Sequence, residues 1–509
     1  MRWPLGLAVF SLAAIAQPDF LIVNARIVDG TGSPWWYGSV SVAGDSIAAI
    51  GPNVNRPAAQ VVDAHGLVLA PGFIDTHSHA LDGLEKQPAA ENILRQGVTT
   101  IIEGPDGRSP LPLAPFLTKI AALPPGVNFG LMAGHGTIRS QVMGTENRPA
   151  QPEELQRMKE LMAQAMRDGA FGLSTGLFYV PGNYAPTEEV IELARIAGQM
   201  GGIHTSHIRD EAEHIIDSVN ETIRIGSEGH LPTQVTHHKV IGEIHWGRTR
   251  ETLDLVEQAR RRGVDVTLDV YPYPASGTSL TAWLPPWAVA GGRDALKERL
   301  SVPATRDRIL AEYTEVVKLR GGAEKVQLTN CPAGATLAEA VRKRNLEVNA
   351  ASAAQTALDI VLAGGCTVIS HSLSEEDIER VLRSPYSMVA SDGGIAMRHP
   401  RSYGTFARVL ALYVREKRLL TLEEAIRKMT SFPATRFRIY DRGILRPGMK
   451  ADLVLFHPAR IQDQATYSEP RQLATGVDSV WVNGRPAIRE GRLAAERYGR
   501  ILYGPAHQP

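Results

Sequence analysis

Two histidines separated by one residue carry the most specific chemistry in this sequence. His77 and His79 end a short segment, residues 73–79, that we interpret as a β-strand. Because alternate side chains of a strand point to the same side, both imidazoles project together and Ser78 points away. Two neighbouring imidazoles at a strand end can share one metal ion. An arbitrary His-x-His pair is more often two surface histidines, so the rest of the chain must supply further ligands.

Ligand-type side chains recur where other predicted strands end. One strand leads to His204 and His207, the next leads to His237 and His238, and the last leads to Asp392. Strand periodicity allows only one histidine of each pair to face the same site, and it does not decide which one. Histidine or aspartate at so many strand ends favours a metal site over unrelated polar residues on the surface.

Two carboxylates follow the second predicted strand. Glu103 and Asp106 belong to the run Glu-Gly-Pro-Asp-Gly. Either carboxylate could bridge or complete a metal site. The alternative is that Glu103 is a charge at a strand end and that Asp106 is a turn residue. The residues alone leave this choice open.

Strands alternate with helices through the middle of the chain. Such alternation implies parallel βα units, and eight of them fit a (β/α)8 TIM-like barrel with its active site at the carboxyl ends of the strands. Helical spacing of apolar residues occurs at 153–168, 188–200, 212–228 and 250–263. The strand candidates are residues 73–78, 98–103, 127–133, 170–174, 202–207, 233–238, 264–270 and 388–392.

The remaining segments predict two further units. Short strand-like pieces separated by Gly, Asn and Pro occupy both chain ends, so residues 19–69 and 440–509 should complete one small β-sandwich domain. The barrel then occupies residues 70–439. Residues 284–365, approximately, do not fit the repeat, and we predict an inserted subdomain there. A ninth strand-like run at 366–370 makes the strand numbering ambiguous.

Composition is that of an ordinary soluble protein. Apolar residues make up 43% of the chain, and 54 basic residues match 54 acidic residues, which suggests neither a nucleic-acid nor a membrane-surface partner. Cys331 and Cys366 are the 2 cysteines, and they imply no disulfide framework.

The first residues predict an export signal. Arg2 precedes an apolar run, residues 5–16, that ends in Ala-Ile-Ala. This pattern is typical of a secretory signal peptide, here residues 1–16, and the run is too short to span a bilayer. We therefore expect a periplasmic or secreted mature protein with no membrane span.

Longer motifs surround the candidate ligands. They are Pro-Gly-Phe-Ile-Asp-Thr-His-Ser-His at 71–79, Gly-Leu-Phe-Tyr at 176–179, Tyr-Ala-Pro-Thr at 184–187, His-Ile-Arg-Asp-Glu at 207–211, Thr-His-His-Lys at 236–239, Ser-Asp-Gly at 391–393, His-Pro-Arg-Ser-Tyr-Gly-Thr-Phe at 399–406 and Gly-Ile-Leu-Arg-Pro-Gly-Met-Lys-Ala-Asp at 443–452. With these motifs nearly the whole predicted mature chain resembles the amidohydrolase superfamily, and within it the N-acyl-D-amino-acid deacylases (D-aminoacylases).

The resemblance implies a metal-ligand set. His77, His79, His207 and His237 would be ligands, and Asp392 would both contact metal and transfer protons. His204 and His238 would then be neighbours of the site. The implied metal is Zn²⁺, with one ion bound tightly and room for a second.

One ligand position departs from the family pattern. The bridging residue after the second strand is typically Cys in the family, and Asp106 stands in that place here. A carboxylate is a harder ligand than a thiolate, so metal preference and the occupancy of two sites should change. Glu103 is the second candidate for the bridge.

The implied reaction is zinc-dependent hydrolysis of the amide bond of small-molecule N-acyl-D-amino acids, or small D-configured dipeptides. The products would be a carboxylic acid and a free amino acid. The resemblance assigns the substrate carboxylate to Lys239, Tyr271 and Arg401. Alternatives are hydrolysis of a cyclic amide or lactone, deamination, or a non-catalytic scaffold. Hydantoinase-like relatives carry a carboxylated Lys on the fourth strand, and the matching strand here, at 170–175, has no Lys. Hydrolysis of a cyclic amide is therefore the less favoured alternative.

Overall fold

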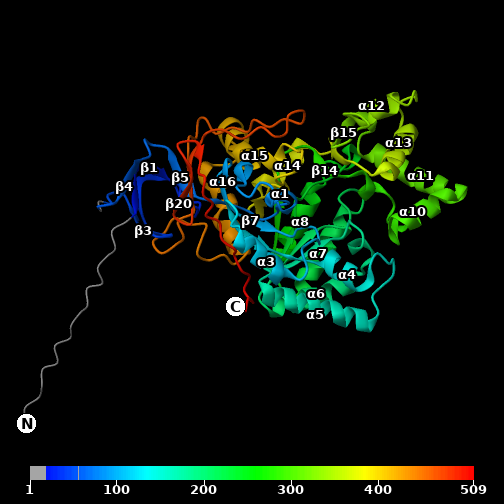
Figure 1. Cartoon of the computed structure of the whole chain (residues 1–509), viewed down its shortest axis with the longest axis horizontal. Coiled ribbons are helices and arrows are strands. Elements are labelled where there is room, and N and C mark those ends of the chain that lie inside the picture. Colours follow the sequence, from blue (N-terminus) through cyan, green and yellow to red (C-terminus); the bar gives the residue numbers. More distant parts are fainter. Residues whose placement is uncertain (1–18, 55–56, 509) are drawn as a thin grey trace, which may run out of the picture.

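Parallel strands form the core of the computed structural model, which describes residues 19–54 and 57–508 (Figure 1). The predicted signal peptide, residues 1–16, lies outside the described residues. All eight predicted strands are present. They are β6 (Phe73–Asp75), β7 (Val98–Glu103), β8 (Asn128–Leu131) with β9 (Ala133–Gly134), β10 (Gly172–Gly176), β11 (Ile203–His207), β12 (Thr233–Val235), β13 (Val266–Val270) and β17 (Ser387–Val389).

Hydrogen bonds join these strands in two arcs, β6-β7-β8 and β9-β10-β11-β12-β13-β17. Only Met132 separates β8 from β9 along the chain. At the other side, a parallel bridge between Ser78 and Gly393 links the residues that follow β6 and β17. Both faces of these strands are buried, as expected for parallel strands covered by helices. The architecture is the predicted (β/α)8 TIM-like barrel.

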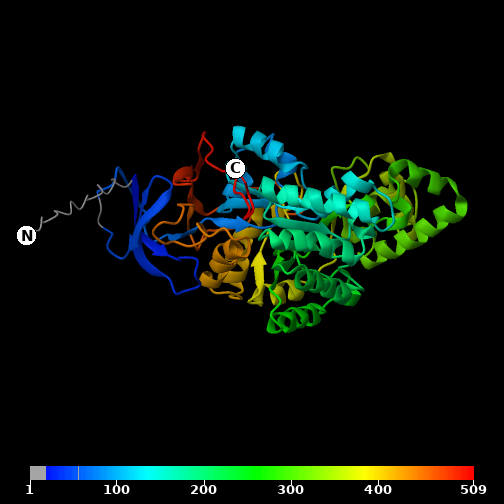
Figure 2. The same ribbon diagram turned by 90° about the horizontal axis from the view of Figure 1, so that it is seen from below.

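Amphipathic helices cover the barrel, as Figure 2 shows from a second direction. The four predicted helices correspond to α5 (Pro152–Asp168), α6 (Thr187–Gln199), α7 (Ile215–Gly229) and α8 (Thr249–Arg261). The sequence determines where α5 begins and ends, because a capping box at Gln151 precedes it and Gly169 follows it in a left-handed conformation. The other barrel helices are α1 (Leu81–Leu84), α2 (Glu91–Leu94), α3 (Leu113–Ala122), α4 (His135–Met143), α14 (Glu375–Arg383), α15 (Arg401–Arg408), the π-helix at Val409–Glu416, α16 (Leu422–Met429) and α17 (Ser431–Arg436).

The two chain ends build one β-domain outside the barrel (Figure 1). They meet where β5 pairs antiparallel with β18, and buried side chains from both ends share one cluster around Ile22, Leu69 and Leu453. The strands are β1 (Phe20–Ile27), β2 (Trp36–Ala43), β3 (Ser46–Gly51), β4 (Gln60–Asp63), β5 (Val68–Pro71), β18 (Leu453–Phe456), β19 (Val477–Val482), β20 (Arg485–Arg489) and β21 (Arg492–Leu493).

The inserted subdomain lies at the opposite end of the molecule from the β-domain in both views. It is wider than the predicted 284–365. Its antiparallel sheet runs β14-β16-β15 with β14 (Ser276–Ser279), β15 (Val326–Thr329) and β16 (Thr367–Ser370). The ninth strand-like run is therefore β16 and not a barrel strand. The helices are α9 (Pro286–Val289), α10 (Gly292–Ser301), α11 (Pro303–Leu319), α12 (Leu337–Arg342) and α13 (Ala350–Ala363).

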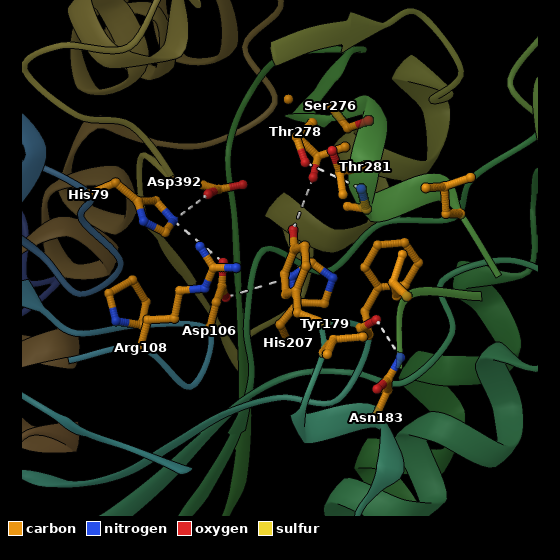
Figure 3. A pocket seen from close by; sticks show the side chains of 18 of the residues that line it. His79, Asp106, Arg108, Tyr179, Asn183, His207, Ser276, Thr278, Thr281 and Asp392 are labelled. Atoms are coloured by element: carbon orange, nitrogen blue, oxygen red, sulfur yellow. Dashed lines mark hydrogen bonds and ion pairs between the residues drawn. The ribbon is translucent and has the colours of Figure 1, made fainter. Parts of the chain in front are cut away.

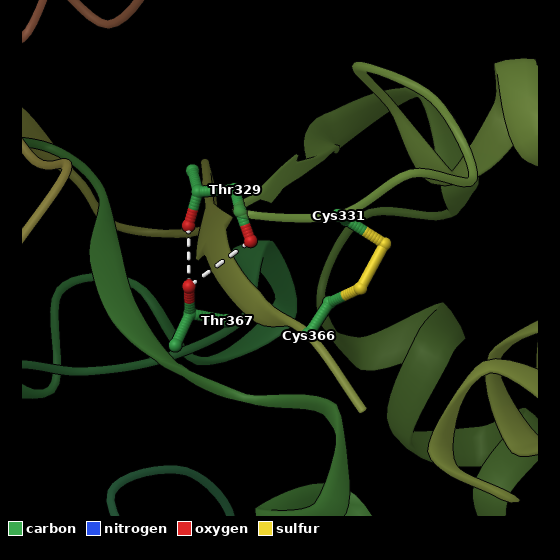
Figure 4. Close-up of a disulfide and its surroundings, with 4 residues drawn as sticks. All are labelled: Thr329, Cys331, Cys366 and Thr367. Carbon is green, nitrogen blue, oxygen red and sulfur yellow. Dashed lines mark hydrogen bonds between the residues drawn. A yellow bond between two sulfur atoms is a disulfide. The ribbon is translucent and has the colours of Figure 1, made fainter. Parts of the chain in front are cut away.

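A disulfide joins Cys331 to Cys366 within this subdomain (Figure 4). The sequence predicted no disulfide framework, and a single disulfide does not make a framework. This bond ties the loop after β15 to the start of β16. Its cysteines are 35 residues apart in the sequence. By the loop-entropy relation, closing such a loop stabilises the folded state by on the order of 3–4 kcal/mol.

No helix among residues 19–54 and 57–508 combines the length and apolar character needed to cross a bilayer.

Candidate active site

Six predicted ligands converge at the carboxyl ends of the barrel strands. Figure 3 labels four of them, His79, Asp106, His207 and Asp392. The six residues follow or end five strands, because parallel strands bring their carboxyl ends to one mouth. The residues are His77 and His79 after β6, Asp106 after β7, His207 at the end of β11, His237 after β12 and Asp392 after β17.

Asp106, His77, His79 and Asp392 form a first candidate metal group. His77 Nε2 lies 3.3 Å from Asp106 Oδ1 and 3.6 Å from Asp392 Oδ1. His79 Nε2 lies 3.4 Å from Asp106 Oδ2 and 3.2 Å from Asp392 Oδ1. One ligand atom from each residue falls within 4.8 Å of the others, which is compact enough to surround one ion.

A second candidate metal group shares Asp106 with the first. Asp106 Oδ1 lies 3.6 Å from His207 Nδ1 and 3.5 Å from His237 Nε2. Asp106 therefore stands between the two groups, in the position of a bridging ligand. Burial alone would raise the pKa of Asp106, but the imidazoles of His77 and His207 hold it well below its ordinary value.

The ligand atoms fit a metal ion because the protein leaves them without partners. Among the described residues, His77 Nε2, Asp106 Oδ1, His207 Nδ1 and His237 Nε2 are buried and accept or donate no hydrogen bond. An unsatisfied buried polar atom costs roughly 1–3 kcal/mol, so four of them around one point indicate a missing partner. Nitrogen and carboxylate donors in compact groups suit Zn²⁺.

Backbone strain marks the same residues. Asp106, His237 and Asp392 have φ angles of 53°, 36° and 48°, in the left-handed region that side chains other than glycine seldom adopt. Each such conformation costs on the order of 1–3 kcal/mol and persists only where surrounding contacts enforce it. Three strained residues that all point ligand atoms into one site indicate that the backbone is shaped for binding.

Two buried aspartates hold the strained segments in place. Asp75 accepts hydrogen bonds from the backbone N–H of Ser391 at 3.0 Å and from that of His77 at 3.3 Å, which ties the first strand to the last. Asp269 accepts from the backbone N–H of His237. Burial raises the pKa of Asp75 to about 6 and that of Asp269 to about 7.

The structure resolves both histidine pairs that periodicity left open. His204 uses both ring nitrogens on neighbouring hydroxyls, Nδ1 at 2.8 Å from Thr233 Oγ1 and Nε2 at 3.0 Å from Thr175 Oγ1. His238 Nε2 lies 2.7 Å from Thr252 Oγ1. Both are therefore packing residues, and the ligand groups contain their partners His207 and His237.

Glu103 lies outside both ligand groups. Its carboxylate accepts hydrogen bonds from the backbone N–H groups of Ala80 at 2.7 Å and Leu81 at 3.2 Å. It thereby secures the loop that follows His79. Asp106 is the residue at the bridging position, and Glu103 supports the loop beside it.

The three predicted substrate-binding residues lie together beside the ligands. Arg401 Nη1 lies 2.8 Å from Asp392 Oδ2, and the Arg401 guanidinium stands 4.8 Å from the centre of the Tyr271 ring. Lys239 Nζ lies 5.8 Å from the same ring. Lys239 and Arg401 line a cavity of about 620 Å³ that opens onto the ligands, and Tyr271 packs against both cations.

Sequence reasoning missed the role of Glu211. It forms an ion pair with Lys239, and its carboxylate lies 3.4 Å from His237 Nδ1 and 3.8 Å from His207 Nε2. Burial alone would raise the pKa of Glu211, and the Lys239 ammonium lowers it below its ordinary value. Glu211 thus orients two ligands from behind. Its position four residues after His207 in the His-Ile-Arg-Asp-Glu motif was the available signal.

Replacing Asp106 should remove the ligand shared by both groups. We expect Asp106→Ala to bind zinc more weakly by over about 100-fold, because even loss of an outer partner costs 10–100-fold. Zinc content after dialysis against a chelator measures this. Asp106→Cys should retain zinc, because a thiolate also bridges.

Glu103→Gln is the matched control. Its amide oxygen can still accept from the N–H of Ala80, and position 103 belongs to neither ligand group, so zinc content should equal that of the wild type. Loss of zinc from Glu103→Gln together with retention by Asp106→Ala would reassign the bridge to Glu103.

Comparisons with known proteins agree with this architecture. The family described as "Amidohydrolase family" matches residues 60–488. A D-aminoacylase from Alcaligenes xylosoxydans xylosoxydans is 37% identical, with 96% of this chain and 98% of the relative covered, and an N-acyl-D-glutamate deacylase of the same organism is 33% identical, with 95% and 96% covered. The crystal structure of N-acyl-D-glutamate deacylase from Bordetella bronchiseptica, complexed with zinc and a phosphonate mimic of the tetrahedral intermediate, has a TM-score of 0.81 at 32% identity and covers 96% of this chain and 100% of its own. This chain belongs to the amidohydrolase family.

Proposed function

We propose that this protein hydrolyses the amide bond of N-acyl-D-amino acids, or of small D-configured dipeptides, to a carboxylic acid and a free amino acid. The observation that carries the proposal is the pair of ligand groups sharing Asp106 at a barrel mouth, beside a cavity lined by buried cations. Relatives at 33–37% identity that are aligned over nearly the whole chain carry deacylase names, which supports the same reaction class.

Zn²⁺ is the proposed cofactor. His77, His79, Asp106 and Asp392 would hold one ion, and Asp106, His207 and His237 would hold another. Bound zinc lowers the pKa of a water molecule towards about 7 and polarises the amide carbonyl. A relative's structure is reported with zinc, and a D-aminoacylase structure describes activation by one metal and attenuation by a second.

Asp392 is the proposed proton carrier. Its Oδ1 faces His77 and His79, while its Oδ2 is held by Arg401. Burial alone would raise the pKa of Asp392, but Arg401 and the nearby imidazoles lower it below its ordinary value. The carboxylate is therefore ionised at neutral pH and can take the proton of the attacking water. It then returns that proton to the leaving amine nitrogen.

Arg401, Lys239 and Tyr271 are the proposed residues for the substrate's carboxylate. A guanidinium can bind a carboxylate through two parallel hydrogen bonds, and Lys adds a point charge. The Tyr271 hydroxyl is buried and has no hydrogen-bond partner among the described residues, so it is available as a donor. Placing the carboxylate here would set the scissile amide between this group and the ligands.

The periplasm or the extracellular space is the proposed location. The Arg2 and Ala-Ile-Ala pattern of residues 1–16 supports an export signal. The disulfide between Cys331 and Cys366 adds independent support, because such bonds persist in oxidising compartments.

A substrate panel tests the reaction. Zinc-loaded protein should hydrolyse N-acetyl-D-leucine, and its kcat/KM for the L-enantiomer should be lower by on the order of 100-fold, the usual penalty for misplacing the reacting group. Amine release is the measurement. Turnover of hydantoins with no turnover of any N-acyl-D-amino acid would overturn the proposal.

Removing the proton carrier should lower the rate of the chemical step. Asp392→Asn should lower kcat by about 10²–10⁴-fold, the usual contribution of a positioned general base and acid. Asp82→Asn is the matched control, because Asp82 lines the cavity but is exposed. Zinc content should be measured in both variants, and a kcat near that of the wild type in Asp392→Asn would remove Asp392 from the mechanism.

Cell fractionation tests the location. The full-length chain expressed in a Gram-negative host should appear in the periplasm, begin near Gln17 by mass spectrometry, and show no free thiol until reduced. A chain lacking residues 1–16 should stay in the cytoplasm. A cytoplasmic full-length protein that retains Met1 would contradict the proposed export.

A further inference from the structure

Arg320 is a cavity residue that the mechanism above does not use. It immediately follows α11 in the inserted subdomain, and only 6% of it is exposed. It nevertheless lines the same cavity as His207, His237 and Arg401. A buried guanidinium beside a binding cavity needs a partner, because desolvating a charge is costly.

The contacts of Arg320 leave its charge without a counter-ion. Its guanidinium stacks 4.8 Å from the ring centre of Trp283, and Nη1 donates to Ser276 Oγ at 3.3 Å. Nε has no hydrogen-bond partner, and no carboxylate among residues 19–54 and 57–508 approaches within ion-pair distance. Burial lowers the pKa of Arg320, and the more distant Glu211 offsets this only in part.

The other buried cations of the cavity already have acidic partners. Lys239 Nζ is paired with Glu211 and donates to the backbone carbonyl of His237 at 3.0 Å. Arg401 is paired with Asp392 at 2.8 Å. Arg320 is therefore the buried cation that is left to neutralise a bound anion.

Arg320 and Arg401 both line the cavity, and both approach β14, at neighbouring residues whose side-chain directions alternate. Arg320 bonds Ser276, and a Cβ added to Gly277 would stand 3.3 Å from Nη2 of Arg401. The end of helix α11 packs closely against the barrel, because Leu319 contacts Gly242 in the loop after β12. A side chain at position 242 would collide with Leu319. The insertion thus delivers a second guanidinium to the cavity that Arg401 lines.

We propose that Arg320 binds the α-carboxylate of the substrate in the cavity that Arg401 also lines. This inference rests on the proposed function and deepens it, because it assigns the charge that selects a carboxylate-bearing substrate. Arg320 carries one positive charge without an ion-pair partner among the described residues, which can neutralise one anionic group of the substrate. The cavity lining also includes Leu284, Leu296 and Val361, which suit an uncharged side chain better than a second carboxylate. The expected substrate class is therefore a monoanionic N-acyl-D-amino acid with an apolar side chain.

Paired substrates test the assignment. In Arg320→Met, KM for N-acetyl-D-leucine should rise by on the order of 10- to 100-fold with kcat little changed, because a charge-assisted hydrogen bond is lost. With N-acetyl-D-leucinamide, which lacks the anion, the wild type should already be poor and the variant should lose little more. Arg320→Lys should recover part of the affinity for the carboxylate substrate.

Arg308→Met is the matched control, because Arg308 lies on the same helix with its side chain 64% exposed. Thermal melting of every variant should show that the fold is retained, and Arg320→Lys keeps the test decisive if Arg320→Met does not fold. Equal losses with the acid and the amide would overturn the proposal. So would a loss confined to N-acetyl-D-glutamate, which would place a side-chain carboxylate on Arg320. A wild type inactive on all N-acyl-D-amino acids would instead reject the proposed function.

Discussion

The position of the Asp106 carboxylate is the constraint on which the rest of the site depends. Both candidate metal groups include it, with Oδ1 near His77, His207 and His237 and Oδ2 near His79. The chain achieves this with a tight loop held against β10, where the Ser174 hydroxyl donates to the carbonyl of Gly104 at 2.5 Å and accepts from the N–H of Gly107 at 3.3 Å. A Cβ on Gly176 would collide with the Asp106 carbonyl oxygen, so a glycine is required there.

Charge pairing extends outward from that carboxylate in an ordered way. The imidazoles surround Asp106, Glu211 lies behind two of them, and Lys239 pairs with Glu211. On the other side, Arg401 pairs with Asp392. The barrel thus places its buried charges as adjacent opposite pairs, which is what a low-dielectric site demands. Arg320 is the exception, because it has no acidic partner in the described part of the chain, and it comes from the inserted subdomain. The barrel therefore supplies the ligand groups, and the inserted subdomain supplies an additional charge for substrate recognition.

The sequence predicted the barrel strands and His77 with His79 because both depend on local periodicity. Although the family resemblance chose His207, periodicity could not choose it over His204, because both faces of a parallel barrel strand are buried and alternation alone names no inner face. It could not choose His237 over His238, because the left-handed backbone at His237 departs from strand geometry. The role of Arg320 could not be predicted from the sequence for a different reason. Its position depends on how α11 docks against the barrel, and no periodic pattern records that contact.

The family resemblance implies a cysteine at the position of Asp106, and a carboxylate in that place has a geometric consequence. A thiolate bridges through a single sulfur atom, whereas a carboxylate offers two oxygens. Here Oδ2 faces His79, while Oδ1 faces His207 and His237. His77 also lies on the Oδ1 side, 3.3 Å away, so the two groups are not fully separated by the carboxylate. Asp106 can therefore serve the His207–His237 pair through Oδ1 alone, leaving the group around His79 to depend on Oδ2 and Asp392. A hard carboxylate with two oxygens would therefore let one group hold a metal ion more firmly than the other.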